Sequence, residues 1–197
     1  EKLLDEFPML FPRLLVGPSS TVVRSLLEDR IEIAVHYEVT NNNSLRTHRL
    51  WTEPLLLVGS ADSGLSLDEP VTMEEFSDKP FVLPCVGNAL RKILQDSFNR
   101  MGKKPNIFVE VDSVKVLKDL VKLNHGFAVQ PMTVVHNELR QGELCAAPIG
   151  SPKMTANIVS STSVNRPSSI VASVFSKVLL GEFVKLKEKG ILLGEPY

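Results

Sequence analysis

The residue types that most often carry catalysis or bind metals are few and scattered along this chain of 197 residues. Three of the four histidines, His48, His125 and His136, show no metal-ligand spacing with one another or with Cys85 and Cys145. The sequence contains no GxSxG, P-loop or HExxH pattern, and no GxGxxG follows a predicted strand. We therefore expect no metal site, no cofactor and no enzyme activity.

The two cysteines allow two interpretations. Cys85 and Cys145 have no CxxC partner, and a chain of this size does not need a disulfide to fold. Unpaired thiols favour a reducing cytoplasm, where a buried cysteine packs as a small apolar side chain. A peroxide-type thiol switch is the alternative interpretation.

Polar side chains and glycines gather in loops that follow predicted strands. At the carboxyl ends of parallel strands, such loops lead into helix N-termini, whose unpaired N–H groups and partial positive charge suit an anionic ligand. We predict that a small effector binds the following residues of these loops: Ser19, Ser20, His36, Tyr37, Pro84, Val86, Gly87, Asn88, Arg91 and Gln130.

Each of these residues also has a purely structural interpretation. A serine or asparagine at a helix start, such as Ser19 or Asn88, is often only an N-cap. A lone Arg91 is usually solvated, and a histidine that leaves a strand, such as His36, is commonly a loop residue without a partner. From the sequence alone, both interpretations stay open.

The elements that must position these loops alternate between strands and helices. Residues 13–17 (RLLVG) predict a strand, and a helix follows with Ser19 or Ser20 as its cap. Residues 31–35 (IEIAV) predict the next strand, parallel to the first. The same β-α-β order is predicted again in the middle of the chain, with strands at residues 80–83, 107–111 and 126–130. The helix between the first two strands ends at Gly102, and the helix between the last two is capped by Asp112 or Ser113.

The two ends of the chain are predicted to belong to one lobe. Strands at residues 55–59 and 157–163 supply two crossings, and a long amphipathic helix through residues 171–183 follows the second. We therefore expect a hinged pair built from discontinuous segments. Lobe I comprises residues 1–60 plus 162–197, and lobe II comprises residues 61–161.

Composition limits the partners of this chain. Apolar residues make up 43% and charged residues 23%, which is typical of a globular chain with a sizeable core. The formal net charge is −1, so we expect no direct contact with the DNA backbone. No apolar run is long enough to span a membrane, and the first six residues are too acidic for a signal peptide.

Several phrases of the sequence occur in the order that is typical of one family. Residues 7–17 (FPMLFPRLLVG), 26–35 (LLEDRIEIAV), 49–58 (RLWTEPLLLV) and 126–131 (GFAVQP) resemble the effector-binding domain of LysR-type transcription regulators. The resemblance implies an α/β, two-lobed fold of the type 2 periplasmic-binding-protein kind, with a mainly parallel sheet in each lobe and two crossover strands as the hinge. Val86, Gly87 and Asn88 then match the position of the second lobe's ligand loop.

The resemblance also implies partners and a location. We expect a cytoplasmic homodimer or tetramer whose domains pair antiparallel, with apolar contacts from the C-terminal helix or from the helix at residues 19–29. DNA would be bound only through a winged helix-turn-helix that this chain does not contain. By the same resemblance, residue 1 is expected to lie inside the family's first helix, so that the family's first strand is either truncated from this sequence or formed elsewhere in it.

Two other classes of protein remain as alternatives. A secreted solute-binding protein has the same fold, and the codons upstream of this segment would show a signal peptide in place of a winged helix. An enzyme on this scaffold would need convergent acid and base residues, which the sequence does not display.

Overall fold

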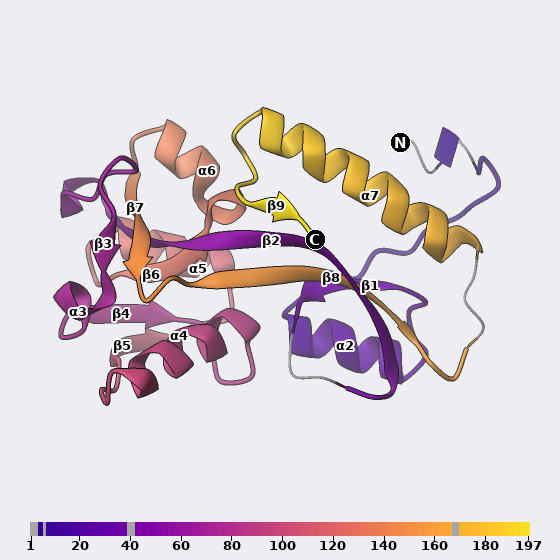
Figure 1. Ribbon diagram of the computed structural model, residues 1–197, viewed down its shortest axis with the longest axis horizontal. Coiled ribbons are helices and arrows are strands. Elements are labelled where there is room, and N and C mark those ends of the chain that lie inside the picture. Colours follow the sequence, from indigo (N-terminus) through magenta and orange to yellow (C-terminus); the bar gives the residue numbers. More distant parts are fainter. Residues whose placement is uncertain (1–3, 6, 39–41, 167–169) are drawn as a thin grey trace. The chain divides into compact units, whose positions relative to one another are not determined.

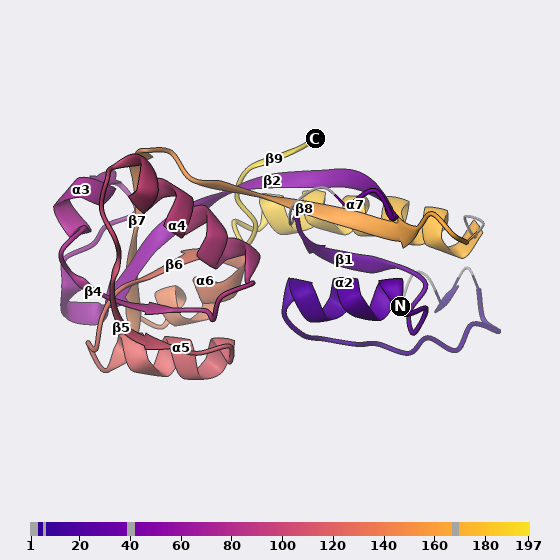
Figure 2. The same ribbon diagram turned by 90° about the horizontal axis from the view of Figure 1, so that it is seen from below.

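The computed structural model describes residues 4–5, 7–38, 42–166 and 170–197 (Figures 1 and 2). Residues 1–3 and 6 of the predicted helical start of the chain, and Pro167 beyond the predicted crossover, lie outside the described residues. Contacts divide the chain into two compact units. Unit 1 comprises Glu1–Thr52, Asn157–Gly190 and Gly194–Tyr197, and unit 2 comprises Glu53–Ala156 and Ile191–Leu193. That the chain moves as two lobes divided at residues 60 and 162 stays a prediction.

Unit 1 is built around antiparallel strands. The strand β1 pairs antiparallel with β8 (Ala34 with Ser161), and β9 pairs antiparallel with β2 (Trp51 with Pro196). The apolar side of α2 packs on β1 because Val22 and Leu26 bury against Ala34. The elements that lie wholly in unit 1 are α2 (Ser19–Leu27), β1 (Ala34–Tyr37), α7 (Ile170–Glu188) and β9 (Glu195–Pro196), and two strands are shared with unit 2, β2 (Leu45–Ser60) and β8 (Thr155–Ser163).

The first predicted β-α-β unit is wrong. Residues 13–17 form no strand, and the side chains of Leu14 and Val16 are almost fully exposed. The neighbouring strand β1 lies at the end of the sheet order and pairs with β8 alone among the described strands. Because a strand is stable only when its backbone groups are paired, an apolar run without a pairing partner does not form one, and residues 13–17 pair with no described strand.

Unit 2 holds most of the elements that the sequence predicts. The second half of β2 pairs antiparallel with β6 and with β7, whereas β4 and β5 run parallel to each other and β3 runs parallel to β7. The architecture is therefore an α/β fold with mixed sheets and flanking helices (Figure 1). Its elements are η1 (Ala61–Ser63), β3 (Val71–Thr72), α3 (Met73–Phe76), β4 (Pro80–Leu83), α4 (Ala89–Arg100), β5 (Asn106–Glu110), α5 (Val114–Lys122), β6 (Ala128–Pro131), α6 (Met132–Arg140) and β7 (Leu144–Ser151).

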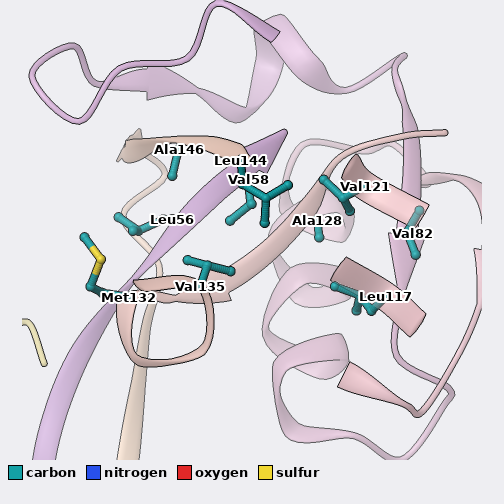
Figure 3. Close-up of a cluster of buried hydrophobic side chains, with 10 residues drawn as sticks. All are labelled: Leu56, Val58, Val82, Leu117, Val121, Ala128, Met132, Val135, Leu144 and Ala146. Carbon is teal, nitrogen blue, oxygen red and sulfur yellow. The ribbon is translucent and has the colours of Figure 1, made fainter. Parts of the chain in front are cut away.

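A continuous apolar core holds unit 2 together. Figure 3 shows its buried side chains, which come from β2, β4, β6 and β7 on the strand side and from α5 and α6 on the helix side. Removing this much apolar surface from water is the main stabilising contribution to such a unit. The core side chains are Leu56, Val58, Val82, Leu117, Val121, Ala128, Met132, Val135, Leu144 and Ala146.

Candidate functional site

The loop that follows β4 is a tight turn at the carboxyl edge of two parallel strands. The Asn88 N–H donates to the carbonyl of Cys85 at 3.2 Å, which closes the turn. Gly87 has φ +97°, a conformation that glycine adopts without strain. Pro84 is buried beneath the turn, whereas the side chain of Val86 is exposed. The turn therefore presents its backbone, and one apolar side chain, to solvent.

Asn88 is the N-cap of α4. Its Oδ1 accepts hydrogen bonds from the backbone N–H groups of Leu90 (2.9 Å) and Arg91 (3.4 Å). The predicted capping role is confirmed, and it engages Oδ1, whereas an anionic effector would accept from the Nδ2–H groups. An effector contact by Asn88 stays a prediction.

Arg91 is not a solvated surface residue. Its side chain is buried in the first turn of α4, and its Nη2 lies 3.2 Å from Glu110 Oε1 at the end of β5. This partner was not predicted from the sequence, because the two residues meet through the parallel pairing of β4 and β5.

Acidic groups also surround the neighbouring thiol. Asp112 Oδ1 accepts the backbone N–H of Cys85 at 3.2 Å. Burial raises the pKa of the Cys85 thiol, the carboxylates of Asp112 and Glu110 raise it further, and Arg91 acts in the opposite direction. A raised pKa keeps the thiol protonated at neutral pH, which disfavours the thiol-switch interpretation.

The unit 1 residues of the predicted site differ in exposure. The helix α2 begins at Ser19 with Pro18 in the N-cap position and no side-chain cap, so the predicted capping by Ser19 or Ser20 is wrong. Ser19 is buried and Ser20 is exposed. Pro18 has no side-chain acceptor, and its carbonyl accepts the N–H groups of Thr21 and Val22 at the first turn of the helix.

His36 is a buried, hydrogen-bonded side chain within β1, whereas the sequence placed it in a loop. Its Nδ1–H donates to the Tyr37 carbonyl at 2.8 Å, which leaves Nε2 to accept from the Ser161 hydroxyl at 3.0 Å. Burial lowers the pKa of His36, and this effect outweighs the opposing influence of the Tyr37 carbonyl and of Glu38. Both ring nitrogens are already engaged within unit 1.

The lowered pKa of His36 makes a pH dependence of stability testable. Because its folded-state pKa lies below the usual 6.5, the unfolded chain binds more protons as the pH falls through that value. We expect the free energy of unfolding to decrease between about pH 7.5 and 5.5. Urea unfolding at a series of pH values should show a flatter profile for His36→Gln. The exposed His48→Gln is the control, and an equal flattening in both variants would contradict the assignment.

A polar network next to β1 was not predicted from the sequence. Arg49 Nε donates to the Glu38 carboxylate at 3.0 Å, and Asn157 Nδ2 donates to the same carboxylate at 2.8 Å. Burial alone would raise the pKa of Glu38, but the hydrogen bonds from Asn157 and Arg49 bring it below its usual value. Arg49 Nη1 also donates to the Tyr197 hydroxyl at 2.8 Å, so this network ties the C-terminal residue to β2.

The structure thus divides the predicted effector residues between the two units. Ser19, Ser20, His36 and Tyr37 belong to unit 1, whereas the residues from Pro84 to Arg91 and the buried Gln130 of β6 belong to unit 2. The unit 2 residues of the turn and the first turn of α4 adjoin one another. Their role in effector binding stays a prediction.

Neither a metal site nor a membrane-spanning helix is found in the part of the chain that the structure describes. In that part, no three histidine, cysteine, aspartate or glutamate side chains lie close enough together to hold a metal ion. Likewise, none of the described helices combines the length and the apolar surface needed to cross a membrane.

Solved structures share this fold at low sequence identity. The regulatory domain of CcmR from Synechocystis PCC6803, in complex with 2-PG, has a TM-score of 0.81 at 15% identity, over 92% of this chain and 87% of that one. The effector-binding domain of QuiR, in complex with shikimate, has a TM-score of 0.75 at 16% identity, over 92% of this chain and 88% of that one. The fold is therefore that of regulatory, effector-binding domains.

The sequence comparison identifies the family. The profile of the LysR substrate binding domain matches residues 1–183, and the chain belongs to this family. The HTH-type transcriptional regulator BbuR of Bordetella bronchiseptica is 25% identical over 161 residues, which cover 80% of this chain and 50% of that protein. The chain spans about half the length of the curated relatives that it matches. These relatives are transcriptional regulators and not transport proteins.

Proposed function

We propose that this chain is the effector-sensing part of a LysR-type transcription regulator, which binds a small anionic metabolite and thereby changes how the full-length protein binds DNA. The observation that carries this proposal is the family match over residues 1–183. The net charge of −1 supports a division of labour in which another part of the full-length protein contacts DNA. Such a regulator acts in the cytoplasm and catalyses no reaction.

The turn after β4 supports an anionic ligand. Cys85 to Asn88 lead into the N-terminus of a twelve-residue helix, where the backbone carries a partial positive charge, and Arg91 adds a full one. The CcmR domain holds 2-PG and the QuiR domain holds shikimate, so small metabolites occupy domains of this fold.

Effector binding acts by shifting a conformational equilibrium. The ligand favours whichever arrangement of the lobes, residues 1–60 plus 162–197 and residues 61–161, it binds more tightly. The shift is limited by the difference in affinity between the two arrangements. The DNA-binding part then responds to the favoured arrangement.

A thermal-shift screen over small carboxylates and other metabolites tests this function. A ligand at a hundredfold excess over its Kd adds about 2.7 kcal/mol to the free energy of unfolding. The ligand found should then change DNA binding by the full-length protein in a gel-shift assay. Stabilisation without any change in DNA binding would contradict the regulatory part of this proposal. A thermal shift that is the same in the Ser19→Ala and Asn88→Ser variants as in the wild type would show that the effector does not bind these loops.

We also propose that the chain forms a homodimer through unit 2. The strand β5 pairs only with β4 among the described strands, and its Ile107 and Phe108 are exposed. Leu123 at the end of α5 is 68% exposed. By contrast, α2 exposes only Leu27 among its large apolar residues, so the helix at residues 19–29 offers less apolar surface than β5 and α5 do.

Phe108→Glu is expected to dissociate this dimer. A buried carboxylate at the centre of an apolar contact raises the dimer dissociation constant by at least about tenfold. Analytical ultracentrifugation across a concentration series measures the change. Ile170→Glu at the start of α7 is the matched control, since Ile170 is also exposed. If Ile170→Glu dissociated the dimer and Phe108→Glu did not, the interface would involve α7 and not β5.

A further inference from the structure

Arg91 has a hydrogen-bonding group that the protein leaves unused. The residue is only 7% exposed, and its Nη1 is buried without a hydrogen-bond partner among the described residues. A guanidinium carries five N–H donors, and a buried donor without a partner costs free energy. The other terminal nitrogen, Nη2, lies 3.2 Å from Oε1 of the Glu110 carboxylate. One carboxylate oxygen therefore serves only part of the guanidinium.

Arg91 lies at the carboxyl edge of two parallel strands. Leu83 at the end of β4 pairs with Glu110 at the end of the parallel strand β5, so both carboxyl ends meet at one edge. The helix α4 starts from the loop at this edge. Ligands of open α/β sheets bind at such edges, and helix N-termini there favour anions. Since Asn88 already caps the N–H groups of Leu90 and Arg91, the Arg91 side chain remains as the donor for a ligand.

The two members of the ion pair differ in exposure. The Arg91 side chain is 8% exposed, whereas the Glu110 side chain is 36% exposed. Glu110 can therefore rotate into solvent at low cost, whereas Arg91 is held in place. An oxyanion with two oxygens can contact both Nη atoms at once, which Glu110 does not do in this structure.

We propose that Arg91 and Glu110 form an anion-exchange latch: a carboxylate or similar oxyanion of the effector binds both Nη atoms of Arg91 and displaces the Glu110 carboxylate. This inference rests on the proposed function, because it assigns the chemical class of the ligand at that same site. Asp112 lies on the same edge and accepts the Cys85 N–H, so a singly charged oxyanion fits better than a dianion. Glu110 thus serves as a built-in counter-ion that fills the site until the effector arrives.

Titration of the protein with acetate, followed by the side-chain Nε–H resonance of Arg91 in ¹⁵N NMR, tests the latch. Arg91→Gln identifies that resonance and should weaken acetate binding at least tenfold. Glu110→Gln removes the competing charge and should strengthen acetate binding at least tenfold. Inorganic phosphate at pH 8, as a dianion, should bind more weakly than acetate at the same ionic strength.

Control variants separate the latch from general charge effects. Lys92 is the next residue on α4, is exposed and pairs with Asp96, so Lys92→Gln should leave acetate binding unchanged. Arg91→Lys keeps the charge but loses the planar fork, and it should fold while binding more weakly. Equal acetate affinities in the wild type and Glu110→Gln, or an Arg91 resonance that does not move, would overturn the latch. If the latch fails but the thermal-shift screen finds an effector, the proposed function stands without the latch. If acetate shifts the Arg91 resonance but no metabolite stabilises the chain, the latch is supported and the proposed function is not.

Discussion

Replacing Gly126 with alanine is expected to lower the free energy of unfolding by about 3 kcal/mol. A Cβ at this position would lie 2.6 Å from the Pro80 carbonyl oxygen and 3.0 Å from its carbon. That carbonyl accepts the Phe127 N–H at 2.8 Å, and the Phe127 carbonyl in turn accepts the Val82 N–H at 2.8 Å. Backbone must therefore move to make room, and it carries hydrogen bonds that link the start of β4 to the approach to β6.

Urea unfolding followed by circular dichroism measures this loss. Gly181→Ala is the matched control, because Gly181 lies inside α7 and an added Cβ would meet nothing within 4 Å. Alanine is the better helix former, so this control should gain about 0.5–1 kcal/mol. A Gly126→Ala protein as stable as the wild type would show that the Pro80 carbonyl can shift freely, and the described packing would then be wrong.

Local signals in the sequence located the elements of unit 2 well. The strand predicted at residues 80–83 is β4, and the helix predicted to end at Gly102 is α4, with Gly102 at φ +67° just beyond it. Ser113 caps α5 as one of the two residues proposed. Caps, terminating glycines and helical periodicity depend on neighbours within a few residues, so a single sequence contains them.

Strand pairing was harder to predict, because it depends on residues far apart in the sequence. Residues 13–17 carry a strand-like run but have no adjacent strand in the described structure. The long strand β2 was predicted only at residues 55–59, because the exposed residues near its start (Arg46 to Arg49) carry no apolar alternation. The strand β7 and the helix α6 were not predicted at all.

The same distinction applies to the candidate site. Its turn and the Asn88 cap follow from the types and spacing of adjacent residues. The Arg91–Glu110 pair requires the register of β4 against β5, and the buried state of His36 requires the hydroxyl of Ser161 on β8. Contacts of this kind decide whether a polar side chain is solvated, structural or free for a ligand, and they were the contacts that the sequence left open.

Trp51 provides a separate probe for unit 1, because it is the one tryptophan of the chain. It is fully buried, and its ring meets that of Phe183 edge to face at 6.0 Å between centroids. Lys187 of the same helix places its Nζ 5.9 Å from the centre of the Trp51 ring. Emission from Trp51 therefore reports whether α7 stays packed on β2.

Phe183→Ala is expected to lower the free energy of unfolding of unit 1 by about 3 kcal/mol and to shift Trp51 emission to longer wavelength. The loss has two causes, the apolar area removed and the cavity left beside the indole ring. Phe183→Leu retains most of the volume and should cost only about 1 kcal/mol. Fluorescence and circular dichroism recorded on the same urea series distinguish the two units, because Gly126→Ala acts in unit 2 and Phe183→Ala in unit 1. If Phe183→Ala left both the emission maximum and the fluorescence transition unchanged, α7 would not be held by this aromatic contact.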